Sequence, residues 1–216
     1  MSNFLVLKTL LHPSYFPNIA TFSMIVSSEI CWEAEDNYQK QTYRNRSYIC
    51  TDQGKHLLSI PIQHVGGNQG RQKYKLVILD DSEQWQRQHW RTLQTAYRTS
   101  PFFEFYEDEI APLFEKSYKY LYDFNLETIH TVCDCLQVDF PVDKTESFML
   151  EPLGMDDKRV MVSAKRKVSY KNDEYHQVFG DRHNFIENLS VLDLLFNEGT
   201  NALTYLRQFY NLNFND

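Results

Sequence analysis

The start of the chain constrains the fold most, because it predicts a strand, a tight turn and a helix in quick succession. Phe4 to Leu11 is a short apolar run typical of a buried strand. Pro13 ends that run, since proline lacks a backbone N–H and restricts the residue before it. Asn18 can cap a helix from Ile19 to about Ser27, whose apolar positions recur at helical spacing. Strand, turn and helix in this order open an α/β unit, in which ligands bind where strands end in loops.

The remaining patterns predict a β-hairpin, further strands and a helical middle section. Ser47–Cys50 and His56–Ile62 flank Asp52-Gln53-Gly54, which is a hairpin signal. Helices are expected over residues 83–98, 102–116 and 121–136, and another follows Ser190; short strands are expected at Tyr74–Leu79 and Phe148–Leu150. We therefore predict a single α/β domain over residues 1–216, with a mixed sheet flanked by helices, a Rossmann-like opening and a helical middle.

Charge and hydropathy patterning exclude several classes of partner. With 22 basic and 29 acidic residues the net charge is −7, which opposes binding to nucleic acid. No apolar run is long enough to span a membrane, and the N-terminus lacks the features of a signal peptide, so we expect a cytoplasmic protein. The four cysteines lack the spacing of a zinc site, and the Gly-rich segment 65–71 matches no nucleotide-binding fingerprint. We therefore expect no metal and no cofactor.

Polar residues are concentrated between Tyr175 and Gly199. Ser190 and Asp193 fit a capping box, in which the Ser side chain accepts from an early helical N–H and the acid reaches back. The loop before that helix has no such structural explanation, and it carries three polar residues that predict a ligand site: Arg182, His183 and Asn188.

A second polar concentration occurs early in the chain. Arg44 and Arg46 lie on the same side if the chain is extended there, so both guanidiniums can bind one phosphate or carboxylate. A solvated strand face is the alternative interpretation. His12 and Tyr15 directly follow the first strand, where α/β proteins commonly bind ligands.

Four motifs occur in order along nearly the whole chain: Pro13-Ser-Tyr15-Phe16-Pro17; Thr42-Tyr43-Arg44-Asn45-Arg46; Trp85-Gln-Arg-Gln88-His89-Trp90 with Tyr97 and Ser100-Pro101-Phe102; and Asn188-Leu189-Ser190-Val-Leu192-Asp193. Their order and spacing resemble the WbqC-like family. Many relatives carry Gln before the first proline, where this chain has His12, and the segment over residues 138–171 is shorter here.

The resemblance implies a bacterial protein of O-antigen or other surface polysaccharide biosynthesis. It implies a transferase that attaches an acyl or aminoacyl group to an amino-sugar, with a nucleotide-sugar or acyl donor as its small-molecule substrate. Two alternatives stay open: a non-catalytic sugar- or nucleotide-binding protein, and an assembly protein of the same pathway. Self-association into a homo-oligomer is also left open.

Transfer to an amino-sugar requires a base, because an ammonium must lose a proton before it attacks an acyl carbon. His89 and His183 are the candidate bases, and Asp193 is the candidate that orients an imidazole. A histidine on an apolar helical face, such as His89, is more often a hydrogen-bonded core residue. The predicted substrate-binding residues are His12, Tyr15, Arg44, Asn45, Arg46, Gln88, Arg182 and Asn188.

Overall fold

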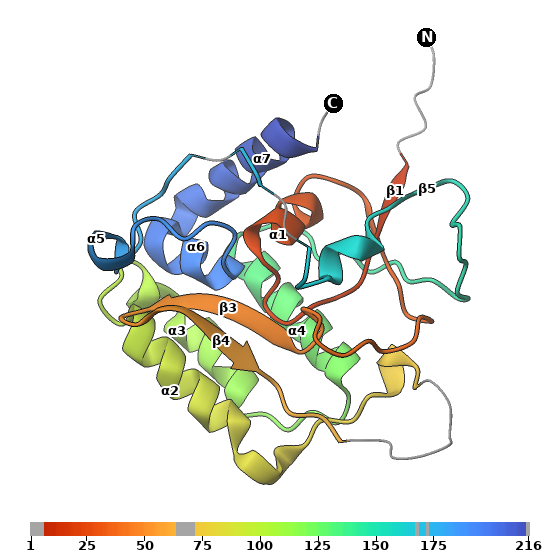
Figure 1. Cartoon of the computed structure of the whole chain (residues 1–216), viewed down its shortest axis with the longest axis horizontal. Helices are drawn as coiled ribbons and strands as arrows, with labels where there is room; N and C mark the ends of the chain where they lie inside the picture. The colour runs from red at the N-terminus through yellow and green to blue at the C-terminus, as the bar shows by residue number, and fades with distance from the viewer. Residues whose placement is uncertain (1–6, 64–71, 167–168, 172, 215–216) are drawn as a thin grey trace.

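Two small sheets lie among the helices in the computed structural model, which describes residues 7–63, 72–166, 169–171 and 173–214 (Figure 1). The first sheet is parallel, in the order β2-β1-β5, and consists of β1 (Lys8–Leu11), β2 (Ile30–Trp32) and β5 (Met155–Asp157). The second is an antiparallel hairpin of β3 (Arg46–Thr51) and β4 (Gly54–Ser59). The predicted α/β class is therefore confirmed, with its parallel and antiparallel pairings in separate sheets.

The described helices include α-helices and short 3-10 turns. The α-helices are α1 (Ile19–Ile25), α2 (Trp85–Tyr97), α3 (Phe103–Ile110), α4 (Leu121–Cys135), α5 (Gly180–His183), α6 (Val191–Glu198) and α7 (Ala202–Asn213). The 3-10 turns are η1 (Tyr74–Leu76), η2 (Asp81–Glu83), η3 (Ala111–Phe114), η4 (Arg159–Val162) and η5 (Gly199–Asn201). The predicted helical middle section corresponds to α2, α3 and α4.

The opening unit has the predicted form. β1 leads through a turn into α1, and the chain returns as β2, which pairs in parallel with β1. Asn18 caps α1, since its Oδ1 accepts a hydrogen bond of 2.9 Å from the Thr21 N–H. Every residue of α1 is buried, as expected for a helix that is packed on all sides rather than on one face.

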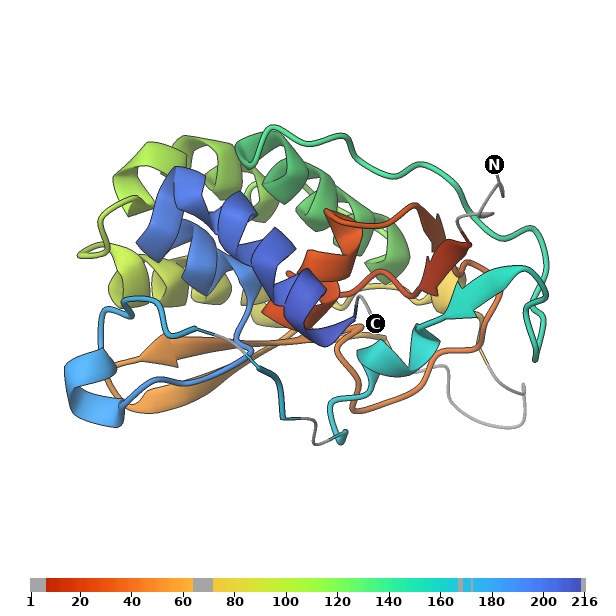
Figure 2. The same ribbon diagram turned by 90° about the horizontal axis from the view of Figure 1, so that it is seen from above.

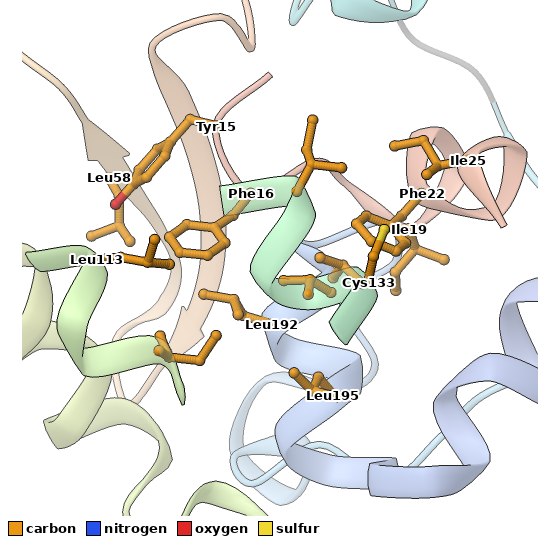
Figure 3. Packing of buried hydrophobic residues seen from close by; sticks show 14 of the residues in the cluster. Tyr15, Phe16, Ile19, Phe22, Ile25, Leu58, Leu113, Cys133, Leu192 and Leu195 are labelled. Atoms are coloured by element: carbon orange, nitrogen blue, oxygen red, sulfur yellow. The ribbon is translucent and has the colours of Figure 1, made fainter. Parts of the chain in front are cut away.

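Apolar side chains from both halves of the chain form one core. Figure 3 shows part of it, with residues of α1, β4, η3, α4 and α6 gathered in a single cluster. The starts of α1 and α6 are hydrogen-bonded to each other, since the Ile19 N–H donates to the Leu189 carbonyl and the Val191 N–H to the Pro17 carbonyl, each at 2.9 Å. Segments far apart in the sequence therefore pack together in the core. Burial of apolar surface is the main stabilising contribution to such a core.

The two ends of the molecule differ in what they contain. In Figures 1 and 2 the turn of the β3–β4 hairpin and α5 lie at one end of the long axis. β1 and β5 lie at the opposite end in both views. Polar residues located at these two ends are therefore far from each other.

Two predicted strands do not form. Tyr74–Leu76 is the 3-10 turn η1. The buried residues Tyr74, which begins it, and Val77, which follows it, have the three-residue spacing of that helix rather than the alternation of a strand. Phe148–Leu150 lies in an exposed segment, and β5 forms at Met155–Asp157 instead. β5 has no local strand signal, because it is short and contains two aspartates; pairing with β1 makes it a strand.

A substitution at Gly199 tests the packing of the end of α6 against Phe102. Gly199 ends that helix with φ of 56° and ψ of −123°, and a Cβ there would lie 2.5 Å from Cδ1 of Phe102. We expect Gly199→Ala to lower the free energy of unfolding by roughly 2–4 kcal/mol, because backbone strain adds to a steric clash. Urea denaturation followed by circular dichroism measures this change.

Gly154→Ala is the matched control. Gly154 also has a positive φ, of 74°, but a Cβ added there would meet nothing within 4 Å. Strain alone should cost roughly 1–2 kcal/mol there. Equal losses in the two variants would contradict a steric role for Phe102.

Candidate functional site

The three parallel strands end at one edge of their sheet, and each end carries a polar side chain. His12 follows β1, Glu33 follows β2, and Asp157 is the last residue of β5. The Glu33 N–H donates to the Leu11 carbonyl at 2.8 Å, which ties the first two strand ends together. Ligands of α/β proteins commonly bind at such an edge.

Polar side chains gather at this edge in what we call the strand-end cluster: His12, Glu33, Asp36, Arg44, Asp157 and Arg159. Arg44 Nη2 lies 2.8 Å from His12 Nε2 and 3.3 Å from Asp36 Oδ2. A guanidinium only donates hydrogen bonds, so His12 Nε2 accepts and His12 Nδ1 carries the imidazole proton. The two protons of Arg44 Nη2 can thus be donated one to His12 Nε2 and one to Asp36 Oδ2.

His12 is held neutral by its surroundings. Burial lowers the pKa of His12 to about 4, although the nearby Asp36 carboxylate opposes the shift. Burial raises the pKa of Asp36, but the hydrogen bond from the Asn37 N–H and the charge of Arg44 oppose that effect, and the pKa of Asp36 is lowered overall. At neutral pH the imidazole is therefore uncharged and the carboxylate ionised.

Arg159 organises the other half of the cluster. Its Nε and Nη2 lie 2.9 Å and 2.6 Å from the two carboxylate oxygens of Asp157, which is a bidentate pair. Its Nη1 reaches Glu33 Oε2 at 3.2 Å. The same guanidinium donates to the carbonyls of Met149 and Leu150, so it also holds the segment before β5.

The protein core positions Arg44. Its guanidinium carbon lies 5.2 Å from the centroid of the Tyr74 ring, and its carbonyl accepts a 2.6 Å hydrogen bond from Asn125 Nδ2. The Tyr74 hydroxyl in turn donates to the carbonyl of Pro13 at 2.8 Å. Arg44 is 1% exposed, so its orientation is determined by these contacts rather than by solvent.

Two buried donors in the cluster have no acceptor among the described residues: His12 Nδ1 and Arg44 Nε. Leaving such a donor without a partner costs about 1–3 kcal/mol. The two guanidiniums face three carboxylates and one neutral imidazole, so negative charge is in excess. A ligand with an oxygen acceptor next to a positive charge would satisfy both conditions.

Arg46 and Asn45 lie close to this cluster but are arranged differently from the prediction. Arg44 is in a turn and Arg46 begins β3, so the two do not share one face of a strand. Both nevertheless approach Tyr38: burial raises the pKa of Tyr38 to about 12, and the charges of Arg44 and Arg46 oppose that shift. Asn45 Nδ2 donates to the Ile60 carbonyl at 2.9 Å.

Tyr15 and His89 form a buried pair away from solvent. The Tyr15 hydroxyl lies 2.9 Å from His89 Nδ1, and the backbone of Ser59 also hydrogen-bonds the imidazole. Burial lowers the pKa of His89 to about 4. Gln88, the residue before it on α2, is exposed.

Asp193 is fully buried and hydrogen-bonded by uncharged partners. It accepts from the Tyr97 hydroxyl at 2.6 Å, the Tyr175 hydroxyl at 2.5 Å and Gln177 Nε2 at 3.0 Å. Burial raises its pKa. His183 Nε2 lies 2.7 Å from the carbonyl of Asp52 instead. In the described residues, the structure does not bring the predicted catalytic trio of His89, His183 and Asp193 together.

The predicted capping box is half correct. Ser190 caps α6 by accepting from the Leu192 N–H at 3.3 Å, but the Ser190 N–H donates to the Tyr48 carbonyl rather than to Asp193. The reason is burial, since the Asp193 carboxylate points to the tyrosine hydroxyls named above.

The other residues predicted in this stretch have separate contacts. Asn188 Oδ1 accepts from the Ala20 N–H at 2.9 Å, which helps to cap α1. Arg182 lies over the Phe179 ring at 5.7 Å from its centroid, beside the hairpin turn and not at the strand ends. The residues predicted to bind substrate are therefore dispersed: His12 and Arg44 lie in the strand-end cluster, and Arg182 lies beside the hairpin turn.

Sequence reasoning missed Glu33, Asp36, Asp157 and Arg159. The rule that ligands bind at strand ends could have found Glu33, because it directly follows β2. Asp157 and Arg159 had no such signal, since β5 itself was not predicted.

Within the described ranges, no three His, Cys, Asp or Glu side chains are arranged to hold a metal ion. None of the described helices is long and apolar enough to cross a membrane. The four cysteines are free thiols.

These features define an α/β protein with a charged cluster at the carboxyl ends of a parallel sheet. The chain belongs to the WbqC-like protein family, whose model matches residues 12–169. It is 28% identical over 199 residues to the uncharacterized protein Rv1507c of Mycobacterium tuberculosis, covering 79% of this chain and 84% of that protein. No solved structure matches. The family match contains the whole strand-end cluster and ends before His183 and Asp193.

The two neutral imidazoles predict how stability depends on pH. Their pKa values of about 4 lie below the ordinary 6.5, so the unfolded chain binds more protons between these values. The contribution of the two neutral imidazoles to the free energy of unfolding is complete above about pH 6.5. It is lost as the pH falls towards 4, by roughly 3 kcal/mol for each imidazole. Urea denaturation at stepwise pH measures this loss.

His12→Gln and His89→Gln isolate each contribution, since glutamine does not titrate. Each variant should lose less stability than the wild type between pH 6.5 and pH 4. The raised pKa of Asp193 acts in the opposite direction and is common to all three proteins. An unchanged pH dependence in both variants would contradict the neutral state of the imidazoles.

Proposed function

We propose that this protein is a cytoplasmic transferase of bacterial surface polysaccharide biosynthesis, which binds an amino-sugar at the strand-end cluster and adds an acyl or aminoacyl group to its amino group. Membership of the WbqC-like family supports the pathway, because the resemblance implies O-antigen-like biosynthesis. The observation that carries the proposal is the pair of unpartnered buried donors, His12 Nδ1 and Arg44 Nε, beside an excess of carboxylate charge.

An amino-sugar has the oxygen acceptors and the positive charge that would complement this cluster. Its hydroxyl or ring oxygens can accept from His12 Nδ1–H and Arg44 Nε–H, which have no acceptor among the described residues. Its ammonium can approach Asp36, whose side chain is 16% exposed and whose pKa is lowered. The charges of Arg44 and Arg46 both act on Tyr38, and Arg46 is the proposed contact for a second substrate group.

Transfer requires the amine to be neutral. The nitrogen then attacks the acyl carbon, a C–N bond forms, and the bond between the acyl carbon and its leaving group breaks. Asp36 is the proposed proton acceptor, because it is the ionised carboxylate next to the unpartnered donors. His89, His183 and Asp193 stay as predicted alternatives, and Tyr15, Asn45, Gln88, Arg182 and Asn188 stay as predicted binding residues.

A non-catalytic binding or assembly role is the second candidate. It is favoured by the contacts of the predicted bases, since His89 is hydrogen-bonded to Tyr15 and Ser59, and His183 to the backbone of Asp52. Groups that are engaged in this way are poorly available to a substrate. Recognition would still use the same unpartnered donors.

Mass spectrometry of the surface polysaccharide separates the two candidates. A transferase predicts that cells without the gene make polysaccharide lacking the mass of one acyl or aminoacyl substituent. A binding or assembly protein predicts less polysaccharide of unchanged composition. Unchanged amount and composition would contradict both.

Substitutions of His12 test, in the same mass-spectrometry experiment, whether the strand-end cluster is the substrate site. Gln can reproduce both functions of the neutral imidazole, because its Oε1 accepts from Arg44 and its Nε2–H can donate to a ligand. We therefore expect His12→Gln to restore the substituent in cells without the gene, and His12→Leu to restore about tenfold less, the effect of losing one hydrogen bond worth about 1–1.5 kcal/mol.

His130→Leu is the matched control, since that histidine is half-exposed on α4 and its imidazole lies 3.7 Å from Asp134 and beside the Phe140 ring, away from the cluster. It should behave as the wild type. If His12→Leu restores the substituent fully while it is expressed at the normal level, the strand-end cluster is not the substrate site.

A further inference from the structure

A groove lies between the hairpin turn, α2 and the residue before α5. The hairpin turn and α5 lie at the end of the molecule opposite β1 and β5 (Figures 1 and 2). The volume of the groove is about 620 Å³, within the range of about 300–1,000 Å³ that is typical of small-molecule sites. Its lining residues include Thr51, Asp52, His56, Arg91, Thr95 and Phe179.

Small side chains on α2 create the hollow. Thr92 and Thr95 lie on one side of this helix, and Thr99 follows just beyond its end. β-branched threonines are poor residues for an exposed helix, where long residues such as Lys or Glu would be more stable and would fill the space. Local choices that oppose stability often mark functional surfaces.

The threonine hydroxyls in the groove present acceptors. Thr92 Oγ1 donates to the Gln88 carbonyl and Thr95 Oγ1 to the Arg91 carbonyl, each at 2.9 Å. Their protons are therefore used within the helix, and their oxygen lone pairs are left for a donor from a ligand.

His183 positions the opposite wall. Its Nε2 lies 2.7 Å from the carbonyl of Asp52, which links α5 to the hairpin turn. Phe179, directly before α5, is thereby held beside that turn, and Arg182 packs on its ring. This arrangement gives Arg182 and His183, singled out in the sequence for their polarity, a structural place at the groove.

The lining is balanced in charge. Asp52 and Arg91 carry opposite charges, and His56 is the remaining ionisable side chain of the lining. The other lining residues offer hydroxyls, an amide, methyl groups and one aromatic ring. Phosphate binding usually requires an excess of positive charge, and the lining residues of this groove do not have one. The groove is therefore poorly suited to a phosphorylated ligand.

The geometry points to a second binding site, in which this groove holds a neutral saccharide. The apolar C–H faces of a sugar ring pack on Phe179 and the threonine methyl groups, and its hydroxyls donate to the threonine oxygens and accept from Arg91. The inference is independent of the proposed function, because it uses no residue of the strand-end cluster.

Saturation-transfer NMR on the full chain tests this site with two neutral trisaccharides, maltotriose and N,N′,N″-triacetylchitotriose, and with uridine diphosphate as a charged comparison. Thr95→Arg places a long side chain in the groove, and Arg has a higher helix propensity than Thr, so the helix is retained. Thr204→Arg makes the same change at an exposed position of α7.

We expect at least one trisaccharide to bind the wild type and Thr204→Arg at millimolar concentration. Thr95→Arg should bind it at least about tenfold more weakly, because the added side chain occupies the groove. Equal binding by Thr95→Arg, binding of neither trisaccharide by the wild type, or binding of uridine diphosphate alone would overturn the inference. Circular dichroism of both variants checks that the fold is unchanged.

Discussion

Burial of the Arg44 guanidinium is the constraint on which the strand ends depend. A buried charge is costly unless it is paired and hydrogen-bonded, and Arg44 is 1% exposed. Its guanidinium is compensated from three separate segments: His12 after β1, Asp36 after β2 and Tyr74 in η1. Asn125 in α4 fixes the backbone of Arg44 by donating to its carbonyl. One charge thus connects the parallel sheet to the helical half of the molecule.

The hydrogen bonding of the buried groups in the strand-end cluster is incomplete, and this makes the cluster a candidate ligand site. Arg44 Nε and His12 Nδ1 lack an acceptor among the described residues, while Asp36 stays ionised. Unpartnered polar groups in a buried network are costly, so a ligand that pairs with them gains binding energy. The groove at the far end differs, since it is balanced in charge and lined by small side chains. The two places therefore suit different ligands, one polar and charged and one neutral.

Some of the fold and of the site could be predicted because the signals are local. Asn18 caps α1 and Asp52-Gln53-Gly54 forms the hairpin turn, as expected from neighbouring residues alone. His12 was also expected at a strand end, and it lies in the cluster. Arg159 could not be found, because its position depends on β5, which exists only through pairing with β1. Asp193 looked catalytic by residue type, yet burial directs it to tyrosine hydroxyls.

The sequence by itself determined the α/β class, the opening strand-turn-helix unit, the hairpin and the family, since each depends on patterns of neighbouring residues or on motif order. Tertiary structure decided which polar residues meet, and in which protonation state. Distance along the chain does not encode burial, and burial is what makes His12 neutral and leaves its Nδ1 without a partner among the described residues.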